Sequence, residues 1–182
     1  MAVARENRAT SPFSALLAGL QAGMIGVLWM LAWLGVSAAW QRSSFWAPEN
    51  LLASTFYGGE AIHSGFSTTT VSGWALYLLL YSALGGIWAA AVQGKLPRIR
   101  LALVSIVLAV GWYYLFFQVI CRTLSPLVTL LHVVRPTILG HVIYGALVAR
   151  FPRYLPGVAS EEELPAAVES VADPEPANRP DA

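Results

Sequence analysis

Four ionisable residues beside the apolar segments of this chain have a spacing that could form a polar cluster. Glu60 and His63 are three residues apart, and so are His132 and Arg135. Residues three apart share one face of a helix, so two short helices at one end of the molecule would bring all four together. Glu60 could then be a metal ligand or proton acceptor, both histidines ligands or proton relays, and Arg135 an anion-binding group. The alternative is a structural Glu60–Arg135 ion pair that holds an outer loop, with the histidines at a wet interface.

A second polar set lies within apolar sequence. Thr137, His141 and Tyr144 fall on one stripe of a helix, and Tyr77 and Tyr81 fall on one stripe of another. A buried neutral histidine needs a hydrogen-bond partner. We therefore expect a tyrosine hydroxyl of the earlier helix to bond His141 inside the membrane.

Haem ligation by His141 together with His63 or His132 is an alternative interpretation of the histidines. The nine residues between His132 and His141 turn them to opposite faces of a continuous helix, so a shared site would need a kink or a second chain. The single cysteine, Cys121, excludes a cysteine-based metal cluster. One Glu-x-x-His copy also falls short of a di-iron bundle. We expect no metal and no cofactor.

Composition restricts the class of protein. The chain has 182 residues, of which 57% are hydrophobic and 12% charged, with a mean hydropathy of +0.60 and a net charge of +1. A soluble domain has about 25% charged residues, and a chain of this length cannot bury so much apolar surface in one core. The absence of a basic block excludes a nucleic-acid partner. The lipid bilayer is the expected surrounding.

Hydropathy predicts an all-α integral membrane protein, a bundle of four transmembrane helices with short outer interfacial segments. Three spans, at about 14–40, 71–93 and 101–120, are free of charge and exceed or match the roughly 20 residues needed to cross. The fourth is predicted at about 135–154, after a short interfacial segment. Only 14 residues separate Arg135 from Arg150, so either these arginines reach the interfaces or a helix from near Leu127 is kinked at Pro136.

The distribution of basic residues predicts the orientation, because cytoplasmic loops are rich in Lys and Arg. One side holds Arg5, Arg8, Lys95, Arg98, Arg100, Arg150 and Arg153, and the other holds Arg42, Arg122 and Arg135. We therefore expect both termini in the cytoplasm and the protein in the cytoplasmic (inner) membrane. Residues 1–13 form the cytoplasmic N-terminus and 14–155 the membrane domain.

Residues 156–182 differ sharply from the rest, because acidic residues alternate with prolines and large apolar side chains are scarce. Such a segment buries too little surface to offset its ordering entropy. We interpret it as a disordered cytoplasmic tail that solvates the chain, with partner binding as the alternative.

Small residues predict how two spans pack. Gly19, Gly23 and Gly26 mark one face of the first span, and Ser82 and Gly86 repeat the four-residue spacing in the second. Small residues at this spacing let helix backbones approach closely in lipid. Packing within the chain is our interpretation, and a homodimer is the alternative.

The segment His141-Val142-Ile143-Tyr144-Gly145, with the small-residue run Ala18-Gly19-Leu20-Gln21-Ala22-Gly23, resembles small four-span bacterial inner-membrane proteins of uncharacterised families. The resemblance implies a four-helix bundle in the inner membrane. It implies no activity, substrate or catalytic residue.

The sequence contains no G-x-S-x-G, H-E-x-x-H, P-loop or dinucleotide motif, so we assign no catalytic residue. We expect a non-enzymatic membrane component, either self-associating or an accessory subunit of a larger complex. The alternative is a small oligomeric transporter or channel, in which the cluster of Glu60, His63, His132 and Arg135 lines an outer vestibule. A haem- or metal-binding redox protein is a third interpretation and an intramembrane enzyme a fourth.

Overall fold

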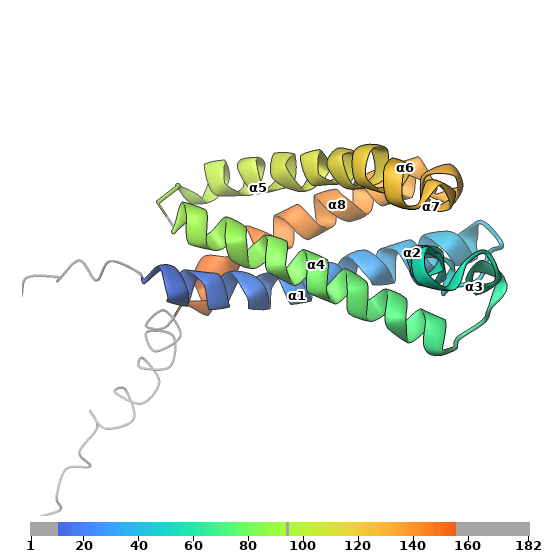
Figure 1. The fold of residues 1–182 in the computed structure, drawn as a ribbon. Coiled ribbons are helices and arrows are strands. Elements are labelled where there is room, and N and C mark those ends of the chain that lie inside the picture. The colour runs from blue at the N-terminus through green and yellow to red at the C-terminus, as the bar shows by residue number, and fades with distance from the viewer. Residues whose placement is uncertain (1–10, 94, 156–182) are drawn as a thin grey trace, which may run out of the picture.

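The computed structural model describes residues 11–93 and 95–155, and every regular element in these ranges is a helix (Figure 1). The all-helical class agrees with the prediction. Arg5 and Arg8 of the expected cytoplasmic N-terminus, and the acidic segment 156–182, lie outside the described residues.

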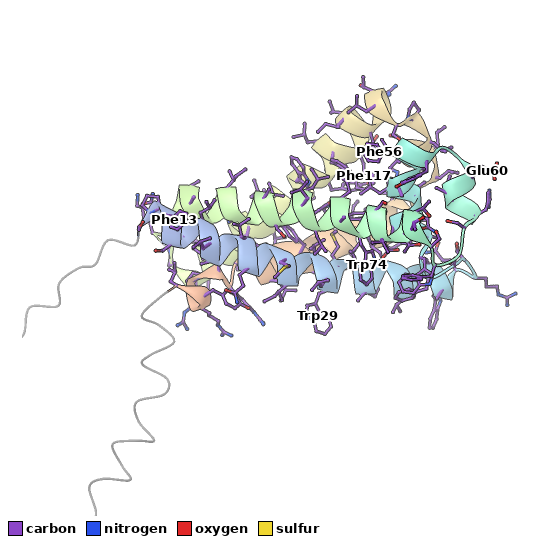
Figure 2. All side chains as sticks on the ribbon, turned by 60° about the horizontal axis from the view of Figure 1, so that its bottom comes forward. Phe13, Trp29, Phe56, Glu60, Trp74 and Phe117 are labelled. Atoms are coloured by element: carbon purple, nitrogen blue, oxygen red, sulfur yellow. The ribbon has the colours of Figure 1, made fainter. Side chains whose placement is uncertain are left out.

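Three helical stretches have the length and composition to cross a membrane: α1 (Pro12–Trp40), α4 (Thr68–Val92) and the continuous run Arg98–Leu124. The last consists of α5 (Arg98–Tyr113), the π-helix η1 (Tyr114–Ile120) and α6 (Cys121–Leu124). At 1.5 Å per residue, the 29 residues of α1 extend about 43 Å, more than the roughly 30 Å of a hydrocarbon core. Large apolar side chains such as Trp29 point away from the bundle (Figure 2), where lipid would cover them.

The fourth apolar helix, α8 (Val134–Val148), has 15 residues and extends about 22 Å. It follows the short helix α7 (Pro126–Leu131) after a break at His132 and Val133, whose backbones are extended. Pro136 therefore stands in the first turn of α8, where its missing N–H leaves no helix bond unmade. The 3-10 helix η2 (Phe151–Tyr154) follows α8.

Short helices gather at one end of the bundle (Figure 1). There, α2 (Ala47–Tyr57) and α3 (Glu60–His63) lie near α6 and α7, and Gly58 makes the turn between α2 and α3 with a left-handed φ of 74°. We call this the α2–α3 end. The connection from α4 to α5 lies at the opposite end, which we call the α4–α5 end.

The helices α1 and α4 pack through small residues. A methyl group at Gly85 would lie 2.7 Å from the carbonyl oxygen of Gly19 and 2.9 Å from the Cα atom of Gly23. Gly86 lies against α1 as well, and Ser82 lies opposite Gly23. Backbone contact of this closeness is available only where side chains are absent.

Other contacts complete the bundle. Gly26 faces the ring of Tyr144, so α1 also packs on α8, and α8 in turn packs on α5. The indole of Trp33 donates to the carbonyl oxygen of Pro136 at 3.0 Å, and the indole of Trp88 donates to Ser105 Oγ at 2.9 Å. These two bonds join α1 to α8 and α4 to α5.

The substitution Gly85→Ala tests the α1–α4 contact. Because the new methyl group meets backbone atoms that cannot turn aside, we expect it to destabilise the fold by about 1–3 kcal/mol. Gly111→Ala in α5 is the matched control, since its methyl group would meet nothing within 4 Å. Thermal unfolding in detergent, followed by circular dichroism, measures both. Equal midpoints for the two variants would contradict the packing described here.

Candidate functional site

A cavity of about 440 Å³ lies at the α2–α3 end of the bundle. It extends along α1 from the exposed Gln41 to the buried Leu34, a rise of about 10 Å over seven residues. We call it the end cavity. Its mouth is formed by the exposed residues Gln41, Ser43 and His63, and its floor by the buried residues Leu34, Tyr77, Phe117 and Thr137. The volume falls in the range of small-molecule sites, roughly 300–1,000 Å³.

The lining of the end cavity is mostly apolar and contains no aspartate, glutamate, lysine or arginine among the described residues. Apolar side chains come from α1, α2, α3, α7, α8 and η1, including Leu51, Ile62 and Val128. An apolar wall with a few polar groups is typical of sites that bind small molecules.

Tyr77 brings a polar group to this apolar floor. Its side chain is 3% exposed and lines the cavity. Its hydroxyl forms no hydrogen bond with any described residue, in contrast to the hydroxyls of Tyr81, Tyr113 and Tyr144. This hydroxyl is not one of the fully buried side-chain atoms that lack a partner, so it is accessible from the cavity and leaves a hydrogen-bonding position open at the floor.

Beneath the floor lies a hydrogen-bonded layer centred on His141. Nδ1 of His141 donates to the carbonyl oxygen of Thr137 at 2.7 Å, which leaves Nε2 to accept from the hydroxyl of Tyr81 at 2.6 Å. The hydroxyl of Tyr144 donates to the backbone oxygen of Tyr81 at 2.6 Å. The sequence predicts such a tyrosine bond to His141; the structure forms it with Tyr81, whereas Tyr77 lies one turn nearer the cavity.

A second tyrosine–histidine pair lies in the cavity wall. His132 Nδ1 donates to the carbonyl oxygen of Thr129 at 2.8 Å, and its Nε2 accepts from the hydroxyl of Tyr113 at 3.0 Å. Phe117, presented by η1, stacks on His132 with ring centroids 4.7 Å apart. Both ring nitrogens of this histidine are thus engaged within the protein.

The break between α7 and α8 changes one expectation. On a continuous helix His132 and His141 would face opposite ways, but both rings lie beside Tyr113, with centroids 5.9 and 5.3 Å from it. Their Nε2 atoms, which could ligate a haem iron, accept hydrogen bonds from Tyr113 and Tyr81 instead. In residues 11–93 and 95–155, no three His, Cys, Asp or Glu side chains gather in a way that could hold a metal ion.

The predicted outer cluster is only partly assembled. His63 and His132 both line the end cavity, one at its mouth and one in its wall. Glu60 and Arg135 do not line it; both are exposed, and neither forms an ion pair within the described part of the chain. Glu60 projects from the tip of the α2–α3 end, well away from Phe117 (Figure 2). Neither the four-residue cluster nor the Glu60–Arg135 pair is therefore formed, because α3 presents Ile62 and His63 to the cavity and leaves Glu60 exposed.

A buried carboxyl group behind the cavity wall was not part of the predicted cluster. Glu49 of α2 is 1% exposed; Oε1 accepts from the Trp74 indole at 3.1 Å, and Oε2 has no partner among the described residues. Burial raises the pKa of Glu49 above its ordinary value of 4.5, and hydrogen bonds from its own backbone and from Trp74 oppose this only in part. Its partner Trp74 is 25 residues away in the sequence, so local residue spacing does not predict this hydrogen bond.

The neighbouring Asn50 ties α2 to the start of α4. It is fully buried, donates to the carbonyl oxygens of Ser64 and Gly65, and accepts from Thr70 Oγ1 at 2.7 Å. Thr70 Oγ1 also accepts from the backbone N–H of Ser67 at 3.1 Å, which caps α4. The only sequence signal is a pair of polar residues directly before Leu51 and Leu52.

No family model, curated protein or solved structure matches this chain. We therefore infer its function from the geometry and chemistry of its own residues.

The pH dependence of stability tests the burial of Glu49. Because the folded state holds this proton to higher pH than the unfolded chain does, the free energy of unfolding should fall as pH rises from about 4.5 through the raised pKa. Glu49→Gln should remove this part of the slope, whereas Glu60→Gln, at an exposed carboxyl, should keep it. Unfolding midpoints in detergent between pH 4.5 and 8 measure this. If the Glu49→Gln variant kept the full pH dependence of the wild-type protein, the buried carboxyl of Glu49 would not be its cause.

Proposed function

We propose that this protein is a non-enzymatic multi-pass membrane component that binds a small apolar molecule in the end cavity. The observation that carries this proposal is the cavity itself: about 440 Å³, apolar, and without a charged side chain among the described residues that line it. Sites of this size and lining suit small-molecule binding. Binding of a small molecule without catalysis is compatible with an accessory component of a larger membrane complex.

The layer beneath the floor favours binding over conduction. Tyr81, His141 and Tyr144 are fully or almost fully buried and are hydrogen-bonded to one another. None of the three lines the cavity, and they pack below its floor residues Tyr77 and Thr137. This packed layer supports a binding component more than the alternative transporter or channel.

Self-association, the other role that the sequence predicts for a non-enzymatic membrane component, would need a different surface from the small-residue face. Gly19 and Gly23 already contact α4 of the same chain. A homo-oligomer would have to form through the outward apolar faces, where residues such as Leu79 and Val107 are exposed.

We further propose four spans in the cytoplasmic membrane, with α8 as the short fourth span and both termini in the cytoplasm. Five basic residues near the α4–α5 end, against three near the α2–α3 end, support this orientation: Lys95, Arg98, Arg100, Arg150 and Arg153 against Arg42, Arg122 and Arg135. The end cavity then opens at the outer surface.

Cysteine labelling tests this topology. In a Cys121→Ala background, Glu60→Cys should react with a membrane-impermeant maleimide in intact spheroplasts, and Lys95→Cys should react only after permeabilisation. Both positions are exposed, so the reaction depends on which side of the membrane the cysteine lies and not on burial within the protein. Reaction of Lys95→Cys in intact spheroplasts would contradict the proposed orientation and indicate the opposite one.

Binding of pyrene, an uncharged apolar probe, tests the proposed function. With the protein in lipid nanodiscs, energy transfer from its tryptophans to pyrene should contain a saturable component. Ala38→Phe, which places a ring in the cavity wall, should abolish that component. Ala32→Phe makes the same change on an exposed face of α1 outside the cavity and should keep it. Without any saturable component in the wild-type protein, the proposal fails.

A further inference from the structure

The open hydroxyl of Tyr77 indicates which chemistry the end cavity prefers. Near it, Thr137 Oγ1 donates to the carbonyl oxygen of Val133 at 2.7 Å, and both ring nitrogens of His132 are engaged. Of the four floor residues that the structure describes, Tyr77 therefore offers the unsatisfied donor. The hydroxyl of Ser37 also has no partner among the described residues, but Ser37 lies nearer the mouth on α1. A phenol O–H is a hydrogen-bond donor as well as an acceptor.

We propose that the ligand is a compact, uncharged molecule with an apolar body and one carbonyl oxygen, which accepts a hydrogen bond from the hydroxyl of Tyr77. This inference rests on the binding function proposed above. A carbonyl oxygen needs only a donor, which Tyr77 supplies. An alcohol or amide N–H would bring a donor of its own, for which the floor offers only the oxygen lone pairs of Tyr77 and Thr137.

Charge and depth restrict the ligand further. A charged group buried in the end cavity would meet no opposite charge among the described lining residues, and burying an unpaired charge is costly. The cavity follows about 10 Å of α1, from Gln41 to Leu34. A lipid acyl chain extends about 15 Å, half of the roughly 30 Å core, so a compact ring-sized molecule fits better than a membrane lipid.

Three diphenyl compounds of equal skeleton test the inference by displacing pyrene from the protein in nanodiscs: benzophenone with a carbonyl, benzhydrol with a hydroxyl and diphenylmethane with a methylene. We expect benzophenone to bind about three- to tenfold more tightly than diphenylmethane, the usual effect of one hydrogen bond. Tyr77→Phe should remove this difference by weakening the binding of benzophenone to the level of diphenylmethane. Tyr114→Phe, at an exposed tyrosine of η1, should behave as the wild type.

The outcomes separate this inference from the proposed function. Equal binding of benzophenone and diphenylmethane to the wild type, or tighter binding of benzhydrol than of benzophenone, would overturn the proposal that the ligand carries a carbonyl oxygen. The proposed binding of a small molecule would still stand. Tighter binding of 4-carboxybenzophenone than of benzophenone would overturn the uncharged ligand. Failure of pyrene and all the diphenyl compounds to bind would overturn the proposed function itself. The wild-type comparisons decide these points even if Tyr77→Phe folds poorly.

Discussion

The structure depends on one constraint: polar groups inside an apolar helical bundle must find partners within the protein, because apolar side chains offer none. The layer around His141 satisfies this constraint, because both ring nitrogens of His141 and the hydroxyls of Tyr81 and Tyr144 are hydrogen-bonded. The pair of His132 with Tyr113 and the bonds of Asn50 meet it at the α2–α3 end. Three groups are exceptions among the described residues: the open hydroxyl of Tyr77, which lines the end cavity, and the buried atoms Glu49 Oε2 and Trp112 Nε1, which have no hydrogen-bond partner.

Two irregular segments create that cavity. The break at His132 and Val133 separates α7 from α8 and lets His132 turn toward Tyr113. The π-helix η1 presents Phe117 to the same wall, where it stacks on His132. Irregular backbone inside a membrane protein is tolerated where it is buried or lines a cavity, and π-helical turns are frequent at functional sites.

The sequence predicts the helical class and the long apolar helices because hydropathy and charge are properties of each segment alone. Spacing also predicts contacts between regular helices: Gly19 and Gly23 meet α4, and His141 meets a tyrosine of α4. Here helical geometry fixes which side chains share a face.

The α2–α3 end could not be predicted in the same way. The Glu60–Arg135 pair does not form, because α3 presents Ile62 and His63 to the cavity and leaves Glu60 exposed, and this orientation depends on the packing of α3 on α2. The bond of Glu49 with Trp74 joins segments 25 residues apart. A cavity is likewise a property of several packed elements, so no single segment carries its signal.

Photolabelling with benzophenone tests the central claim, a ligand site inside the end cavity, most directly. Benzophenone irradiated with the protein in nanodiscs should attach to cavity residues such as Leu34, Leu51 and Val128, as mapped by mass spectrometry of the digested protein. Excess diphenylmethane should reduce that labelling. Attachment confined to the outward residues Leu79, Leu103 and Val107 would place the probe in lipid and contradict the account.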